Sequence, residues 1–171
     1  MRNEAAILEE MRLAVEGEKV AGEFAGWAGD SHADQMSMVL PFLVCPTETA
    51  TAQLRFRMRR SRPDRDCSAT LVVTYEGHDF CAWRMDWRPQ TPHMNRVGPP
   101  ELRGVEVETG VHDFRLNVAL GLARMHAENL PICIPVEAPP NFSAFVRAVC
   151  GMLNIVLTEA IPDPPWSPRL F

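Results

Sequence analysis

Residues 53–60 read Gln53-Leu-Arg-Phe-Arg-Met-Arg-Arg60, so apolar and charged side chains alternate along this stretch. Leu54, Phe56 and Met58 fall on one parity, and arginines fall on the other. Alternation with a period of two is typical of a β-strand that has one buried and one solvated face. The stretch therefore predicts a strand that turns its apolar side to a core and its arginines away from it.

Two more strands are predicted directly after this one. Ala69–Tyr75 is β-branched and apolar, which favours a more fully buried strand. Phe80–Trp87 is predicted to return beside it across a four-residue hairpin loop at Glu76–Asp79. Residues 53–87 therefore predict a three-stranded antiparallel meander.

The pairing of Tyr75 with Phe80, which this loop implies, predicts the two faces of the meander. A slip of one residue would place the arginines in the core, so the side that each residue faces is better constrained than the exact pairing. The core face is expected to hold Leu54, Phe56, Met58, Val72, Trp83 and Met85. The opposite face is expected to hold Arg55, Arg57, Ala82, Arg84 and Asp86.

Shorter patterns predict further strands on either side of the meander. Met36–Val44 is apolar, and its Pro41 favours an edge strand or two short pieces. Ile132–Val136 is predicted to be another strand. Gly110–Leu120 fits a strand, whereas Val118–Leu130 fits a short helix equally well.

Amphipathic patterns at both ends of the sequence predict helices. Residues 3–26 place apolar side chains on one stripe, with Asn3 as a plausible N-cap. Ala144–Leu153 is predicted to be a second helix, capped by Asn141 or Ser143. Both helices are expected to pack on the sheet.

These elements predict a single α+β domain, with an antiparallel meander of about four to six strands packed against an N-terminal and a C-terminal helix. Its parts are the N-terminal helix (1–28), an α+β core (36–155) and an extended, proline-rich tail (156–171). Trp166 and Phe171 are expected to anchor the tail, and a partner-binding extended segment is the alternative.

Composition is that of a globular protein, because 46% of the 171 residues are apolar and 23% are charged. No apolar run has the length of a membrane span, and acidic residues follow Arg2 where a signal peptide needs its apolar core. The five cysteines contain no C-x-x-C pair, which favours reduced, mostly buried thiols. A cytoplasmic location with no membrane partner is therefore expected.

Positive charge is concentrated in one stretch. The net charge of the chain is −5, yet residues 53–66 hold six arginines against Asp64 and Asp66 and so carry +4. The remainder carries −9. This distribution argues against a nucleic-acid binder that is basic overall and predicts a local anion-facing patch.

Two segments that contain both His and Asn follow the predicted Phe80–Trp87 strand, at Pro92–Asn95 and Gly110–Asn117. Together with the arginine-bearing face, they suggest an anion or nucleic-acid site. The candidate binding residues are Arg55, Arg57, Arg84, His93, Asn95, His112, Arg115 and Asn117.

Three other interpretations of the same residues compete with binding. His93 and His112 have the chemistry of an acid–base pair in metal-independent phosphodiester cleavage. A metal site with Asp86 or Asp113 matches no known ligand spacing, so neither a metal nor a cofactor is predicted. In a purely structural role, the His rings satisfy backbone groups while Asn95 and Asn117 cap turns.

Three short motifs carry a resemblance over residues 53–155: the strand Ala82–Asp86, Pro92-His-x-Asn95 and Gly110-x-His112-x-Phe-Arg-Leu-Asn117. Together they resemble a family of uncharacterised small bacterial and phage proteins. The sequence departs from that family at Phe114, where a second His is usual, and at Leu116, where an aromatic residue is usual. The resemblance implies a setting in host defence, mobile elements or toxin–antitoxin systems.

The function expected from the sequence is a non-enzymatic interaction or accessory protein that binds through the arginine-bearing face. The expected partner is a protein or a second copy of the chain, with nucleic acid as another option. The alternative is a small nuclease-like hydrolase that uses His93 and His112.

Overall fold

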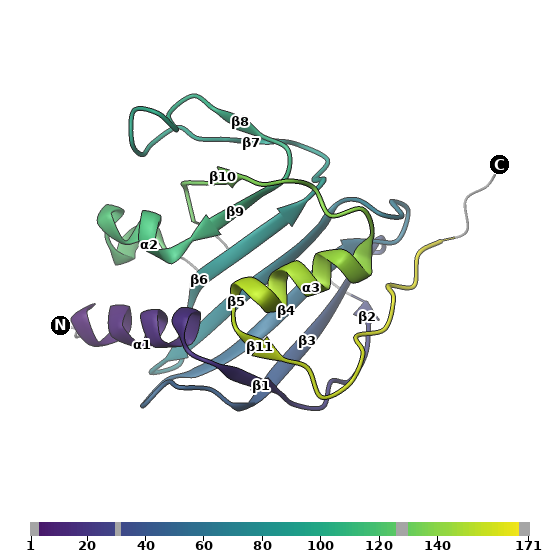
Figure 1. The fold of residues 1–171 in the computed structure, drawn as a ribbon, viewed down its shortest axis with the longest axis horizontal. Coiled ribbons are helices and arrows are strands. Elements are labelled where there is room, and N and C mark those ends of the chain that lie inside the picture. Colours follow the sequence, from purple (N-terminus) through teal and green to yellow (C-terminus); the bar gives the residue numbers. More distant parts are fainter. Residues whose placement is uncertain (1–3, 30–31, 126–129, 168–171) are drawn as a thin grey trace.

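The computed structural model describes residues 4–29, 32–125 and 130–167 and shows an α+β fold (Figure 1). Nine strands form the main sheet in the order β10-β9-β6-β5-β4-β3-β1-β11, with β2 beside β3. Every pairing is antiparallel except that of β1 with β11. The fold class is as predicted, but the sheet is larger than the expected four to six strands.

Four long strands form the middle of this sheet. They are β3 (Gln35–Val44), β4 (Thr51–Arg59), β5 (Cys67–Tyr75) and β6 (His78–Trp87). The predicted meander over residues 53–87 corresponds to β4, β5 and β6 and is confirmed.

Shorter elements complete the chain. The other strands of the main sheet are β1 (Lys19–Ala21), β2 (Ala28–Gly29), β9 (Gly110–Asp113), β10 (Ile134–Pro135) and β11 (Ile155–Val156). A separate two-stranded sheet contains β7 (His93–Met94) and β8 (Glu106–Val107). The helices are α1 (Glu4–Glu16), α2 (Phe114–Asn117) and α3 (Phe142–Met152), and 3-10 turns cover Val118–Leu120 and Leu122–Arg124.

The helices α1 and α3 lie on the same face of the sheet (Figure 1). From α3, Phe145 stacks on Trp87 of β6 at a centroid distance of 5.3 Å and meets Phe56 of β4 edge-on. From α1, Ile7 and Met11 are fully buried. The core therefore lies between these helices and the sheet, and the side chains of opposite parity form a second face.

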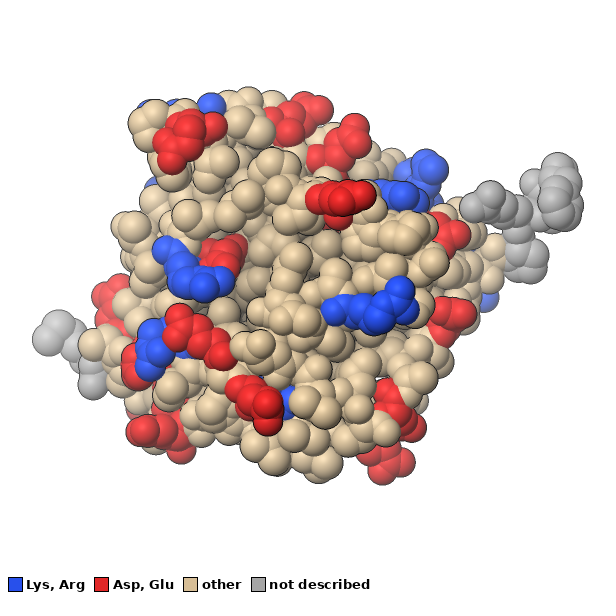
Figure 2. All heavy atoms as spheres, in the orientation of Figure 1, with Lys and Arg blue, Asp and Glu red and all other residues tan. Residues whose placement is uncertain are grey.

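The second face carries the arginines, and we call it the arginine face. The predicted sides are confirmed for Arg55, Arg57, Arg84 and Asp86, which alternate with buried core residues along β4 and β6. On the helix-covered face, acidic and basic residues are interspersed (Figure 2).

The hairpin between β5 and β6 differs from the prediction. Tyr75 pairs with His78 rather than with Phe80, so the loop has two residues, Glu76 and Gly77, instead of four. Both have positive φ, at 48° and 76°, as a type I′ turn requires.

A bulge in the same strand pair restores the predicted sides of β6. The register shifts between Leu71 and Val72, so Leu71 pairs with Trp83 while Val72 pairs with Cys81. Val72 lies two residues from Thr70 and therefore on the arginine side, so its predicted place on the core face is wrong. Ala82 lies at the bulge and belongs to the buried cluster, so its predicted place on the arginine face is also wrong.

The predicted helix over 1–28 ends early. The helix α1 stops at Glu16, and residues 19–21 enter the sheet as β1 between β3 and β11. Lys19 is 0% exposed, and its ammonium group donates hydrogen bonds to the carbonyl oxygens of Ala14 and Gly17 at the end of α1. Burial lowers the pKa of Lys19 to about 8. The predicted N-cap Asn3 lies outside the described residues.

The strand β3 accommodates Pro41 without lying at an edge, so the predicted edge position is wrong. On its outer side, β3 pairs with β2 at Ser37 and Met36 and with β1 at Val44 and Phe42, which leaves Pro41 between the two short strands. No ladder hydrogen bond needs an N–H at that position, and a proline is therefore tolerated.

The C-terminal predictions hold where the structure describes them. Asn141 caps α3, because its side-chain oxygen accepts a hydrogen bond from the backbone N–H of Ala144 at 2.9 Å. Trp166 of the extended tail packs edge-on against Phe142 of α3 at 6.0 Å. Phe171, the second predicted anchor, lies outside the described residues.

All five cysteines are free thiols, and four of them are buried. In the described part of the chain, no helix combines the length and the apolar character that crossing a membrane requires.

Candidate anion-binding groove

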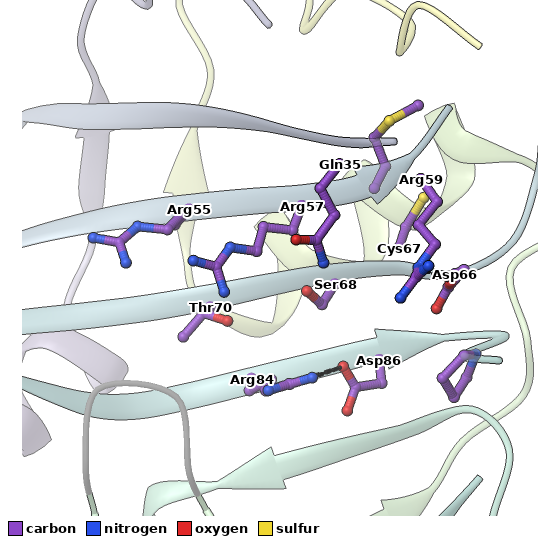
Figure 3. A pocket seen from close by; sticks show the side chains of 12 residues that line it. Gln35, Arg55, Arg57, Arg59, Asp66, Cys67, Ser68, Thr70, Arg84 and Asp86 are labelled. Carbon is purple, nitrogen blue, oxygen red and sulfur yellow. Dashed lines mark hydrogen bonds and ion pairs between the residues drawn. The ribbon is translucent and has the colours of Figure 1, made fainter. Parts of the chain in front are cut away.

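Cross-strand pairing arranges the arginine face in two rows. Arg55 of β4 pairs with Thr70 of β5, which pairs with Arg84 of β6. One step along, Arg57 pairs with Ser68, which pairs with Asp86. Figure 3 shows the side chain of Arg55 lying along β4, the guanidinium group of Arg57 turned toward β5, and Arg84 and Asp86 joined on β6.

Two adjoining pockets lie on this face. The first has a volume of about 250 Å³ and lies over β4, β5 and β6. The second has a volume of about 600 Å³ and is bounded by residues 91–94, Arg96, Val97, Arg124 and Pro131. Arg84, Asp86 and Pro89 line both pockets, so the two form one groove.

Arginines outnumber carboxylates in the groove. Asp66 forms an ion pair with Arg59 at 3.0 Å, and Asp86 forms one with Arg84 at 2.8 Å. Among the described residues of the lining these are the two acidic ones, and each forms an ion pair with an arginine. The arginines that line the groove are Arg55, Arg57, Arg59, Arg84, Arg96 and Arg124. The described residues of the lining therefore carry more positive than negative charge.

Asp86 joins the groove to a buried histidine. One carboxylate oxygen accepts from Arg84, and the other lies 3.2 Å from Nε2 of His112. Burial raises the pKa of Asp86, but the hydrogen bond from His112 and the charge of Arg84 outweigh burial, so the pKa lies below its usual value. Asp86 is therefore ionised at neutral pH and holds Arg84 in place.

Both ring nitrogens of His112 are occupied by the protein itself. Nδ1 contacts the carbonyl oxygen of Leu130, and Nε2 contacts Asp86. Both partners are acceptors, so each contact is satisfied by a ring nitrogen that carries a hydrogen. His112 is only 3% exposed.

His93 lies against His112, with 4.7 Å between the ring centroids and an edge-to-face geometry. Its Nε2 lies 3.0 Å from the carbonyl oxygen of Pro131. Burial and the nearby charge of His112 lower the pKa of His93. A neutral ring that donates its Nε2 hydrogen to Pro131 fits this environment.

Asn117 and Asn95 bind the two residues that follow Pro131, namely Ile132 and Cys133. The side-chain amide of Asn117 donates to the carbonyl oxygen of Ile132 and accepts from its N–H. Asn95 makes the same pair of bonds with Cys133. Both asparagines are 0% exposed.

Residues 130–133 are therefore held one by one by four side chains, and we call this arrangement the backbone clamp. His112, His93, Asn117 and Asn95 bind Leu130, Pro131, Ile132 and Cys133 in that order. This geometry matches the structural role considered from the sequence for these residues, although backbone pairing replaces the turn capping expected of the asparagines.

The structure therefore divides the candidate binding residues. Arg55, Arg57 and Arg84 line the groove, and His93 lines its second pocket. His112, Asn95 and Asn117 are buried in the backbone clamp. Arg115 does not line the groove and instead forms an ion pair with the carboxylate of Asp113 at 2.6 Å. Burial raises the pKa of Asp113, but the contact with Arg115 outweighs burial and lowers that pKa below its usual value.

The geometry does not favour the hydrolase alternative. The two His rings are as close as an acid–base pair requires, but His112 is buried and both of its nitrogens have acceptor partners within the protein. Among the residues that the structure describes, no group of three or more His, Cys, Asp or Glu side chains is placed to hold a metal ion.

Several residues of the groove were missed from the sequence. Arg59 has the same parity as Arg55 and Arg57, so the alternation in β4 was a sufficient signal for it. Met94, Arg96 and Arg124 come from segments without a periodic pattern, and only the folded chain brings them to the second pocket.

Comparisons of the chain with models of protein families, with curated proteins and with solved structures find no match in any of the three. The resemblance to the small bacterial and phage family therefore stays a prediction, and the functional argument rests on the groove.

Proposed function

We propose that this protein is a non-enzymatic interaction protein that binds an anionic group of a macromolecular partner in the groove on the arginine face. The observation that carries the proposal is the lining of that groove, where six arginines surround two aspartates, each of them already paired. A role in bacterial defence or in a mobile element is part of the proposal and rests on the sequence resemblance alone.

The chemistry of the lining supports an anionic ligand. A guanidinium group binds carboxylate or phosphate through two parallel hydrogen bonds, and Ser68 and Thr70 add hydroxyl donors between the arginines. Arg84 is half-buried, with 29% of its side chain exposed, so an ion pair that it forms with a ligand is screened less than one on an open surface.

The proposal is tested by fluorescence anisotropy with two labelled polyanions, oligoglutamate and a short single-stranded DNA. At least one of them is expected to bind at low salt and to weaken as salt is raised. Arg57→Gln and Arg124→Gln, one in each pocket, are expected to reduce the affinity about fivefold or more.

Arg147→Gln is the matched control. Arg147 is exposed on α3, on the opposite side of the sheet from the groove. Its guanidinium group donates a hydrogen bond to the hydroxyl of Ser143. Its loss removes the same charge and should leave the affinity unchanged. Absence of binding by both probes, or an equal loss in Arg147→Gln, would contradict the proposed function.

A further inference from the structure

The two pockets of the groove differ in chemistry. The first is polar, with Ser68 and Thr70 between arginines of β4 and β6. The second adds apolar walls, and among them the large apolar residue Met94 is 42% exposed. The apolar residues that line the second pocket are Pro89, Pro92, Met94, Val97 and Pro131.

A polar, cationic pocket beside an apolar one matches a peptide that carries both acidic and apolar side chains. A carboxylate fits the guanidinium groups of the first pocket in a bidentate geometry. An apolar side chain fits against Met94, since the flexible thioether adapts to different shapes. Such a ligand gains from charge pairing and from burial of apolar area at the same time.

A nucleic-acid strand fits the same groove less well. Sequence-tolerant binding of single strands uses aromatic side chains on which bases stack. Among the described residues that line the two pockets there is no Phe, Tyr or Trp, and the imidazole of His93 is the one aromatic ring. Phe56, Trp83 and Trp87 lie on the opposite side of β4 and β6, in the core.

The charge of the whole chain points the same way. Outside residues 53–66 the chain carries −9, so a long polyanion that extends beyond the groove meets repulsion. A short acidic segment confined to the groove avoids most of that repulsion.

We infer that the partner is a protein and that the groove holds an extended acidic segment of it, with a carboxylate in the first pocket and an apolar side chain against Met94 in the second. The inference rests on the proposed function and specifies the class of partner.

The test compares four labelled probes by fluorescence anisotropy. They are a peptide of Glu-Leu-Ser repeats, a Glu-Ser-Ser peptide of the same length, a Gln-Leu-Ser peptide and a single-stranded DNA with the charge of the first peptide. The Glu-Leu-Ser peptide is expected to bind about tenfold more tightly than each of the others.

Two variants separate the pockets. Met94→Ser should weaken the Glu-Leu-Ser peptide about threefold or more and leave the Glu-Ser-Ser peptide unchanged, because only the first places an apolar side chain on Met94. Arg57→Gln should weaken both. Met94 is exposed, so its replacement does not disturb the core, and a thermal melt verifies that the fold persists.

Two other results would contradict the inference, and they differ in what they imply for the proposed function. If DNA binds as tightly as the Glu-Leu-Ser peptide and Arg57→Gln weakens it, the inferred protein partner is wrong while the proposed anion-binding function stands. If no probe binds, or if neither Met94→Ser nor Arg57→Gln changes the affinity of any probe, the inference and the proposed function fail together.

Discussion

The side-chain amide of Asn95 pairs with the backbone of Cys133 through two hydrogen bonds of 2.8 Å, one to the carbonyl oxygen and one from the N–H. This geometry is that of a neighbouring strand, with a side chain in place of a backbone. Asn95 is fully buried, so the backbone groups that it binds lie away from solvent. Asn117 binds Ile132 in the same way.

Replacing Asn95 with alanine should therefore be costly. Asn95→Ala leaves a buried N–H and a buried carbonyl of Cys133 without partners, and the free energy of unfolding is expected to fall by about 2–4 kcal/mol. Urea denaturation measures the change. Gln90→Ala removes an amide from an exposed position and should have a much smaller effect; equal effects in the two variants would contradict a clamping role for Asn95.

The backbone clamp should also behave as one unit. Asn95 and Asn117 hold consecutive residues, so loss of either one loosens the segment that the other binds. The double variant Asn95→Ala/Asn117→Ala is expected to be less destabilised than the sum of the single variants, by about 1 kcal/mol. Strict additivity in a double-mutant cycle would show that the two asparagines act independently.

Asp86→Asn tests the carboxylate between Arg84 and His112. At neutral pH the variant should lose about 2–3 kcal/mol of unfolding free energy, because the Arg84 guanidinium and the buried His112 ring then share a neutral partner. Asp79→Asn is the control, since Asp79 is exposed and accepts only from the hydroxyl of Thr74 among the described contacts.

The pH dependence of the Asp86→Asn effect has a definite sign. Since the folded-state pKa of Asp86 is lowered, the stabilisation is complete above the unfolded carboxyl pKa of about 3.9 and is lost as pH falls through the folded-state pKa. The difference between the wild type and the variant should thus be constant above about pH 5 and shrink in acid. A difference that grew on acidification would refute this account.

The β5–β6 turn offers a stabilising substitution. Glu76 has a φ of 48°, a value that costs less for asparagine than for glutamate. Glu76→Asn gives the Asn-Gly pair preferred in type I′ turns and should raise the free energy of unfolding by about 0.5–1 kcal/mol. Gly77→Ala, at a φ of 76°, should lower it by about 1 kcal/mol. In thermal melts, the melting temperature should rise in Glu76→Asn and fall in Gly77→Ala.

The sheet was predictable where the pattern is local. The alternation in residues 53–60 identified β4 and its two faces, because a period of two depends only on the strand itself. The Glu76-Gly77 turn and the bulge beside Ala82 were missed, since neither has a strong sequence signal. Trp83 pairs with Leu71 instead of the predicted Val72, and the side predicted for Val72 was also wrong. These two errors cancel on β6, so Arg84 and Asp86 were still placed on the correct face.

Long-range structure was predicted less well. The strand β1 exists only because β3 and β11 flank it, and β11 lies more than a hundred residues away along the chain, so residues 19–21 looked like a continuation of α1. For the same reason, the sequence singled out four polar side chains but did not predict that they bind the backbone of residues 130–133. These side chains are His93, Asn95, His112 and Asn117. Polar residues in irregular segments have many possible partners, and only the folded chain selects among them.

Lys19, the one lysine of the chain, closes the end of α1 from a fully buried position. All other basic residues are arginines, so the folded surface offers guanidinium groups and no side-chain amine. Amine-directed labels and cross-linkers will therefore pass over the folded side chains, and modification of Lys19 will report the opening of the α1–β1 junction. For binding measurements, probes coupled through other chemistry will leave every charge of the groove intact.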